Sequence, residues 1–536
     1  MKKTTKRGLA ILLCCVILLA LAACGKKDAP AATTPPAGGG DSGATTPDNS
    51  NPAAPPASAK DTLTVAVSGD NGTLDPRGIG GSGGFLNVSL CYMEPLWDTN
   101  GKFERIWVLA TGIDTVSPTQ FTVHLREGVT FSNGNPFNAD DVLFTFNLIG
   151  NDPNRSFYLK SIDIPNTTKI DDYTIDMRFL GTDVAQIATM TQTMIYDAES
   201  YDAEDFVTHP IGTGPYVVTE YVVGSHTNMQ ARDDYWDGKP AIEFLKFKVL
   251  NEDSQKVIAL ETETVDVTTV PTQDIEYVKT LSKYDVRVAS SIMCSDVAFN
   301  MTENSVFASK DARLAVIHAI DRDVLVSLAY NGYATVTDYP FSKNMSDYEA
   351  RFGNLGPYAI GYDPDLAREY AEKAGIVGGS EVRIITNGSA DYVTMAEVIQ
   401  EELKAIGVNA VINNYDAASF FDVSFDTTRF DISLYATATP ALMAADVAYT
   451  TFAWSDAGWR GPEKDRFVEV GSQLMGTFDD AQRQDMLYEC LQILADINPT
   501  YGLCDTQAGT AVAKGLGGVE FWSLGDVRYQ DWYWTE

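Results

Sequence analysis

Histidine and cysteine are scarce in this chain of 536 residues. Histidine occurs at four positions, and only His318 follows residue 226. A nucleophilic centre with a histidine base therefore has few candidates, which argues against a hydrolase. Four cysteines follow position 24, at residues 91, 294, 490 and 504, too few and too scattered for a disulfide framework or a Cys-x-x-Cys zinc site. Cys490 and Cys504 could pair with each other, although the spacing fits separate buried thiols better.

Basic residues are also few, because 39 Lys and Arg stand against 73 Asp and Glu and give a net charge of −34. Nucleic acids and anionic lipid surfaces are bound through basic faces, so this balance argues against both as direct partners. The carboxylates lack the alternating spacing and central glycine of a calcium loop. Runs such as Asp140-Asp141 and Asp233-Asp234 are typical of solvated turns and helix starts. The sequence therefore predicts no metal and no cofactor.

Two glycine motifs occur in the wrong context. Gly78, Gly80 and Gly83 satisfy the dinucleotide pattern GxGxxG, and Gly80, Ser82 and Gly84 satisfy the nucleophile pattern GxSxG. Both motifs need a tight turn from a strand into a helix. Here about ten loop residues, including a proline, separate the motifs from the preceding strand. We interpret this stretch as a glycine loop that lines a cleft.

The chain begins with a basic segment and an uncharged apolar run from residue 9 to residue 23. This pattern predicts an export signal, since the run is shorter than the roughly 20 residues that span a membrane. The run ends in Leu-Ala-Ala-Cys-Gly, which resembles the lipobox of bacterial lipoproteins and implies that Cys24 is acylated and becomes the mature N-terminus. A plain signal peptide is the alternative. Loss of the four leader cations leaves 35 basic against 73 acidic residues, a charge of −38, so attachment to a membrane would depend on the lipid.

Residues 24–60 are rich in Ala, Pro, Gly, Thr and Ser and have almost nothing to bury. Such a segment cannot offset the entropy of ordering, so we expect a disordered tether. As a flexible coil it would span about 33 Å. The remaining residues, 61–536, suggest roughly three structural units.

Strand and helix patterns alternate along this folded part. Period-two patterns predict strands at 62–67, 120–126, 173–179, 242–250, 265–270, 381–386, 408–415 and 430–435. Capped or amphipathic patterns predict helices from Asn138 onward and at 253–263, 311–319, 363–374, 391–406, 462–475 and 479–494. The alternation predicts an α/β fold with mainly parallel sheets covered on both faces.

Seven stretches resemble, in order, the extracellular solute-binding family 5 that serves oligopeptide, dipeptide and nickel ABC importers. The most specific is FTVHLREGVTFSNGNPFNADDVLFTF, residues 121–146. Its glycines and aromatics are the pattern of a β-turn with packed flanks, so we expect it to be structural and to make no ligand contacts. The other six are LTVAVSGDNGTLDP from residue 63, YMEPLWDTNGK from 92, PIGTGPY from 210, DDYWDGKP from 233, and the helical stretches 312–322 and 362–375.

The resemblance implies a two-lobed, periplasmic-binding-protein-like clamp of type II with an extra subdomain. Lobe 1 would combine residues 61–98, 208–290 and 505–536, the subdomain would be 99–207, and lobe 2 would be 291–504. The chain would cross between the lobes near residues 289–295. Such a clamp would close over its ligand as a population shift between open and closed states.

The resemblance also implies where a ligand is bound. The expected contacts are Asn71, Thr73, Asp75 and Phe85 at the first loop, Asn300 after a strand of lobe 2, and Tyr435, Thr437 and Thr439 after Phe430. Further candidates are Trp454, Trp459 and Arg460, as a stacking surface and an anion clamp; core aromatics and a solvent-facing arginine are the alternative.

The stretch that follows Phe430 departs from the family pattern. In peptide-binding members it resembles fDl…gW…aDypDP, and the first Asp of the aDypDP part holds the free amino group of the peptide. Here it reads FDISLYATATP, residues 430–440, and that Asp is missing. A buried ammonium without a carboxylate costs several kcal/mol. Either Asp446 or another acid reaches the site, or the solute has no free α-amino group.

The expected function is therefore that of a lipid-anchored, monomeric receptor outside the cytoplasmic membrane or in the periplasm, without catalytic activity. It would capture a peptide or peptide-like solute and hand it to ABC permease subunits. Alternatives are a sugar, osmolyte or metal chelate as solute, a receptor that presents its ligand to a sensor, and an extracellular hydrolase.

Overall fold

The computed structural model describes residues 57–70, 72–78, 85–100, 104–153, 155–339, 341–437, 443–447, 458–521 and 527–535. The predicted export signal, the predicted lipidation site Cys24 and nearly all of the predicted tether lie outside these residues. No helix in the part of the chain that the structure describes is long and apolar enough to cross a membrane.

One large sheet of 11 strands runs through the molecule, in the order β15-β14-β16-β12-β17-β11-β1-β10-β9-β8, with β13 paired to β17. Its strands are β1 (Thr62–Val67), β8 (Tyr216–Val222), β9 (His226–Ala231), β10 (Phe244–Val249), β11 (Val267–Val270), β12 (Tyr284–Phe299), β13 (Ala334–Val336), β14 (Val382–Thr386), β15 (Ala410–Asn414), β16 (Ile432–Thr437) and β17 (Thr500–Ala513).

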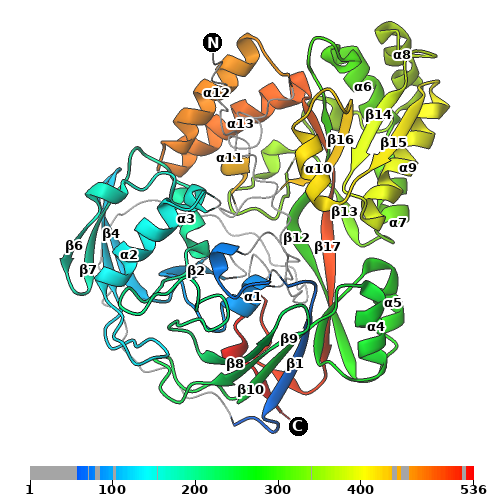
Figure 1. Cartoon of the computed structure of the whole chain (residues 1–536). Helices are drawn as coiled ribbons and strands as arrows, with labels where there is room; N and C mark the ends of the chain where they lie inside the picture. The colour runs from blue at the N-terminus through cyan, green and yellow to red at the C-terminus, as the bar shows by residue number, and fades with distance from the viewer. Residues whose placement is uncertain are drawn as a thin grey trace, which may run out of the picture.

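The long strands β12 and β17 connect the two halves of this sheet. They run side by side between the upper part of the molecule, with β14–β16, and the lower part, with β1 and β8–β10 (Figure 1). The register of this antiparallel pair shifts between Ser290 and Cys294 and again between Ser295 and Asp296. The predicted crossing of the chain near residues 289–295 coincides with the first shift.

The predicted strands and helices each lie within a few residues of an observed element, and the α/β class is confirmed. The prediction of mainly parallel sheets is wrong. Strand β1 is parallel to β10 and β11, and β14 is parallel to β15 and β16, but the other pairs of the large sheet are antiparallel. The alternation of strands and helices in the sequence predicts β-α-β units, whose strands are parallel. It does not reveal that β12 and β17 run in opposite directions or that β8 and β9 form a hairpin.

Helices cover the sheet where the alternation places them. Helix α4 (Asp253–Glu261) connects β10 to β11, and in lobe 2 α6 (Lys310–Ala319), α7 (Arg322–Ala329), α8 (Pro364–Ala374) and α9 (Ala390–Ala405) lie beside β14–β16 (Figure 1). The predicted ends of α8 are confirmed, because Asp363 accepts a hydrogen bond from the Leu366 amide and Gly375 has a left-handed φ of 70°. The other helices are α1 (Phe85–Ser89), α2 (Ala139–Gly150), α3 (Gln186–Thr189), α5 (Ile275–Val278), α10 (Ala417–Ser424), α11 (Ala444–Asp446), α12 (Pro462–Met475) and α13 (Asp480–Ile497).

A separate antiparallel sheet of four strands, in the order β4-β5-β7-β6, occupies the predicted subdomain. Helix α2 packs beside it, and its predicted capping box is present, since Asn138 and Asp141 bond reciprocally to each other's backbone. The strands are β4 (Ala110–Ser117), β5 (Gln120–Leu125), β6 (Thr168–Asp171) and β7 (Thr174–Arg178), and two small ladders pair β2 (Trp97–Thr99) with β3 (Arg105–Trp107) and β18 (Leu516–Gly517) with β19 (Tyr533–Trp534).

The buried apolar side chains form separate clusters that follow the two halves of the large sheet. The largest contains residues between 63 and 289 and between 508 and 534, and it includes the four-stranded sheet. A second lies between residues 297 and 504, and a third combines Ala185 with residues between 339 and 494. The four cysteines at 91, 294, 490 and 504 are buried and unpaired, so Cys490 and Cys504 do not form a disulfide.

The third cluster joins the two halves at a second place. The Val184 amide donates to the Met475 carbonyl at 3.0 Å, and the rings of Phe121 and Phe478 are 6.4 Å apart. Ala185 is buried in the same contact, at 1% exposure. The segment before α3 therefore packs against the end of α12 and the turn that follows it (Figure 1).

Four of the stretches that carry the family resemblance pack together in the lower half. The Glu94 carboxylate of YMEPLW accepts hydrogen bonds from the Tyr235 hydroxyl at 2.6 Å and the Trp236 indole at 3.0 Å, both in DDYWDGKP. The PIGTGPY stretch lies against Tyr92, and its Gly212 carbonyl accepts from the Ser132 amide of the longest stretch. These stretches therefore hold the lower half of the molecule together.

Gly214 leaves no room for a side chain in this packing. A Cβ atom there would lie 2.6 Å from the Tyr92 carbonyl carbon and 2.7 Å from the Cys91 carbonyl oxygen, both backbone atoms that cannot rotate away. We expect Gly214→Ala to lower the free energy of unfolding by about 2 kcal/mol in chemical denaturation. Gly181→Ala is the control, since no atom lies within 4 Å of its added Cβ. Equal stability of the two variants would contradict this packing.

Candidate ligand-binding site

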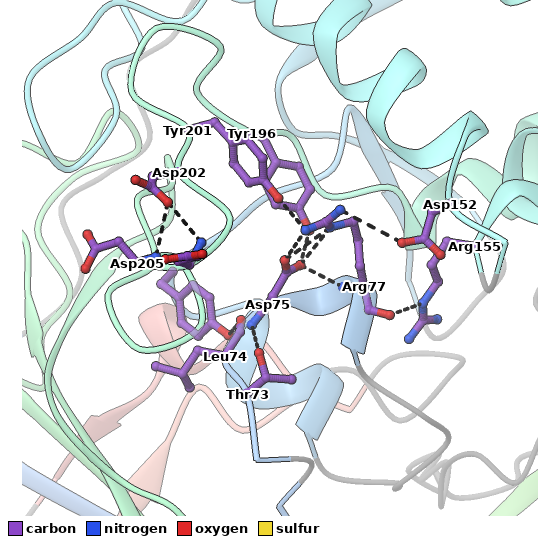
Figure 2. Close-up of polar contacts among 12 residues, drawn as sticks. Thr73, Leu74, Asp75, Arg77, Asp152, Arg155, Tyr196, Tyr201, Asp202 and Asp205 are labelled. Carbon is purple, nitrogen blue, oxygen red and sulfur yellow. Dashed lines mark hydrogen bonds and ion pairs between the residues drawn. The ribbon is translucent and has the colours of Figure 1, made fainter.

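The first loop, after β1, is built around the carboxylate of Asp75. Asp75 is 5% exposed, and its backbone amide donates to the Thr73 hydroxyl at 3.0 Å. Its carboxylate accepts from the Arg77 amide and guanidinium, with a shortest N–O distance of 2.6 Å, and from the Tyr196 hydroxyl at 2.7 Å. Figure 2 shows the Arg77 guanidinium between Asp75 and the rings of Tyr196 and Tyr201.

This network changes the role expected for Asp75. Both of its oxygens already accept bonds from Arg77, so the carboxylate orients the loop and the guanidinium. Burial lowers the pKa of Arg77, but the hydrogen bond and charge of Asp75 outweigh this effect and raise it. Burial and the charge of Asp75 likewise raise the pKa of Tyr196 well above its usual range. Arg77 therefore stays charged, and Tyr196 stays protonated, at physiological pH.

A hollow of about 530 Å³ lies beside this loop, a volume in the range of small-ligand sites. Arg77 and Asp152 both line it and form an ion pair with 3.9 Å between Nη1 and Oδ2, and the Arg155 Nε donates to the Arg77 carbonyl at 3.2 Å. Arg77 was not among the predicted contacts, although it stands directly before Gly78, the first glycine of the dinucleotide pattern. The hollow is lined by Arg77, Phe144, Asn147, Leu148, Asn151, Asp152 and Pro153.

Asn300, at the end of β12, is 2% exposed, and its side-chain amide bonds within the protein. The Nδ2 donates to the Thr427 and Phe430 carbonyls at 2.7 and 2.9 Å, and the Oδ1 accepts from the Thr302 amide and hydroxyl. The side chain therefore holds the turn before β16 against β12. The amide nitrogen and oxygen that a ligand contact would require are already bonded within the protein.

Tyr435 and Thr437 lie at the end of β16, near the place where β12 passes between the halves. In the β12–β16 ladder Tyr435 is opposite Asp296 and Thr437 is opposite Cys294. Tyr435 is partly buried, and its hydroxyl lies 3.5 Å from that of Thr500, while Thr437 is 3% exposed.

Trp459 and Arg460 lie at the start of the segment that leads into α12. Trp459 is 4% exposed in the third cluster, with its ring 5.3 Å from that of Phe467 and the Lys464 ammonium 4.7 Å above it. Arg460 is exposed, and its guanidinium donates to the Trp459 carbonyl at 2.9 Å. Asn71, Thr439 and Trp454 lie outside the described residues, and of Phe85 only the backbone, at the start of α1, is described.

Two buried acids near Thr437 were missed. Asp296 in β12 is fully buried, and Asp505 in β17 is 1% exposed. The only sequence signal was an acid inside a run that is otherwise apolar or small. Asp446, weighed above as a substitute acid, lies in α11 and is 4% exposed. The described residues contain no group of three or more His, Cys, Asp or Glu that could hold a metal ion.

The two halves joined by β12 and β17 define a two-lobed α/β fold of the type seen in periplasmic solute-binding proteins. The oligopeptide-binding protein AppA of Bacillus subtilis, solved with a nonapeptide, shares this fold with a TM-score of 0.75 at 18% identity, covering 90% of this chain and 100% of that one. NikA of Brucella suis, solved with Fe(III)-EDTA, gives a TM-score of 0.79 at 20% identity, covering 88% and 99%.

Sequence comparison identifies the family. Residues 108–459 match the middle region of the bacterial extracellular solute-binding proteins, family 5, and the chain belongs to that family of ABC-transporter solute-binding proteins. It is 26% identical over 392 residues to a Brucella ovis protein provisionally named an ABC transporter peptide-binding protein, over 70% of this chain and 72% of that protein. It is 23% identical to the nickel-binding periplasmic protein of Escherichia coli, over 82% and 88% of the two chains.

Proposed function

We propose that this chain is a lipid-anchored receptor, attached through Cys24, that captures a peptide or peptide-like solute and delivers it to the permease subunits of an ABC importer. The observation that carries the proposal is the pair of strands β12 and β17, which connect two lobes in the fold of family 5. The provisional name of the Brucella ovis relative supports a peptide-like solute. The receptor acts as a monomer and catalyses no reaction.

Closure of the lobes is part of this proposal. Lobe 1 comprises residues 61–98, 208–290 and 505–536, lobe 2 comprises 291–504, and 99–207 form the subdomain. Opening requires the contact between Val184 and Met475 to separate, while the β12–β17 ladder bends at its register shift. A solute that touches both lobes stabilises the closed state by its differential affinity.

Native mass spectrometry of protein taken directly from the producing cells tests the proposal. We expect a fraction of the protein to carry a small solute, whose mass gives its class. Purified protein is also incubated with peptide and ester libraries, and we expect no turnover. Turnover of a library member, or failure to bind any small solute, would contradict the proposal.

Removal of the lipid should separate attachment from binding. We expect Cys24→Ala to move the protein from the membrane fraction to the medium or the periplasm, because a mature charge of −38 offers no affinity for anionic lipid. The affinity for the co-purified solute should not change. Fractionation with immunodetection measures the first result, and titration calorimetry the second. A variant that stays with the membrane would show that the anchor lies elsewhere.

A further inference from the structure

Asp296 and Asp505 form a buried carboxyl pair on the two strands that connect the lobes. In the β12–β17 ladder Asp505 is opposite Cys294 and Asp296 is opposite Gly502, so both side chains project from the same face of the sheet as diagonal neighbours. Asp296 is fully buried, and Asp505 is 1% exposed. Burial, and to a smaller extent the nearby negative charge of Asp505, raises the pKa of Asp296 well above its usual range.

The pair lacks the partners that buried carboxylates require. The Oδ2 of Asp296 and the Oδ1 of Asp505 have no hydrogen-bond partner, and among the described residues neither group forms an ion pair. The other oxygens have weak donors, the Cys294 thiol at 3.4 Å from Asp296 and the Lys343 amide at 3.4 Å from Asp505. The hydroxyls of Thr437 and Ser342 lie beside Asp296 and Asp505 and are neutral, so they do not compensate a charge. An uncompensated buried carboxylate is unfavourable by several kcal/mol. Each group must therefore hold a proton or meet a cation.

The same face carries the predicted ligand contacts of β16. Thr437 is opposite Cys294 and Tyr435 is opposite Asp296, so all four side chains lie on one face of β12 and its neighbours. The opposite face is occupied by lobe 2, where the Ser295 hydroxyl contacts the hydroxyls of Tyr330 and Tyr392. Asp296 therefore lies one strand away from the stretch that lacks the family's acid.

We infer that Asp296 and Asp505 bind a positively charged group of the solute, a primary ammonium or a guanidinium. This inference rests on the proposed function and names the chemistry of the same site. On binding, a protonated carboxyl releases its proton to solvent and the resulting carboxylate pairs with the solute cation, so charge is conserved within the site. Two carboxylates can accept several N–H bonds from one such group.

Binding of the cation should then depend on pH. Burial raises the pKa of Asp505 to about 7, and burial raises that of Asp296 well above its usual range. Affinity for a cationic solute should therefore increase from pH 5.5 to pH 8, by at most tenfold per pH unit for each proton released. Burial raises the pKa values of the nearby Cys294, Cys504, Tyr339 and Tyr358 side chains, so these groups stay neutral in this range. The other charged groups near the pair are Asp338 and the exposed Lys343.

Two matched peptide pools test the inference on the full chain. Both are equimolar pools of the same tripeptides, chosen without Lys or Arg. The tripeptides of one pool have free amino groups, and those of the other are N-acetylated. Native mass spectrometry measures the bound fraction of each pool at pH 5.5 and pH 8. At pH 8 we expect the wild-type protein to bind the free-amino pool at least tenfold more tightly than the acetylated pool. We also expect it to bind the free-amino pool more tightly at pH 8 than at pH 5.5.

The variants Asp296→Asn and Asp505→Asn should each lose at least tenfold of this affinity and most of its pH dependence. Asp98→Asn is the matched control, a buried acid of lobe 1 at 6% exposure with a pKa of about 6. Thermal unfolding verifies that each variant is folded. If a variant is unfolded, the pH dependence of binding by the wild-type protein still tests the inference. Equal binding of both pools, a flat pH profile or binding of neither pool would overturn the inference.

The solute carried by the native protein separates this inference from the proposed function. A co-purified solute with an ammonium or guanidinium group agrees with both. A neutral or anionic solute overturns the inference and leaves the receptor function intact. Failure to bind any small solute overturns both.

Discussion

Replacement of Arg232 by alanine should lower the free energy of unfolding of the chain by about 3 to 5 kcal/mol. Arg232 precedes the DDYWDGKP stretch and is 5% exposed. Its guanidinium donates to the carbonyls of Thr130 at 3.1 Å and Phe131 at 3.3 Å, and to those of residues 212–214 at 3.3 to 3.4 Å. Without it, buried carbonyl oxygens lose their donors and a cavity opens between three stretches of lobe 1.

Chemical denaturation followed by tryptophan fluorescence measures this loss, because Trp236 and Trp97 report on lobe 1. Arg368→Ala serves as the control, since Arg368 forms a surface ion pair with Asp365 at 3.0 Å, and it should change stability by less than about 0.5 kcal/mol. A similar, small effect of both substitutions would show that the carbonyl cage around Arg232 does not stabilise the fold.

Asp505→Asn should stabilise the unliganded protein at pH 8, by up to about 4 kcal/mol, and have little effect at pH 4. Burial raises the pKa of the Asp505 carboxyl in the folded state to about 7, above the value near 3.8 that it has in solvent. Between these values the folded state binds more protons than the unfolded state, so the stability that the group contributes below pH 4 is lost as the pH rises through 7. Asparagine carries no such charge.

The difference in unfolding free energy between variant and wild type, measured by urea denaturation at pH 4, 6 and 8, isolates this group from the other acids. Asp365→Asn is the control, because Asp365 is exposed and its surface ion pair with Arg368 contributes at most about 0.5 kcal/mol. A solute with a cationic group should stabilise the wild-type protein at pH 8, because it compensates the charge of the Asp505 carboxylate. The stability advantage of Asp505→Asn over the wild type should therefore decrease when this solute is present. A gain that is independent of pH would show that packing, and not ionisation, is responsible.

The predicted site illustrates what sequence reasoning could reach. The sequence predicts the position of the first loop, and it predicts Asp75 as a ligand contact. In the structure the Asp75 carboxylate accepts hydrogen bonds from Arg77 and Tyr196. Tyr196 is 121 residues away along the chain, and no local pattern connects the two. Asn300 is also predicted as a ligand contact, and its side-chain amide bonds to carbonyls of a turn 127 to 130 residues further on.

The sequence alone determined the local elements and the family. The capping box at Asn138, the helix from Pro364 to Ala374 and the period-two strands depend on contacts within a few residues, and these are encoded in adjacent positions. The tertiary structure decided the antiparallel pairing of β12 with β17 and the burial of Asp296 and Asp505 on one face. These features depend on a register between strands about 200 residues apart. Only this register places both carboxyls in the interior, away from water.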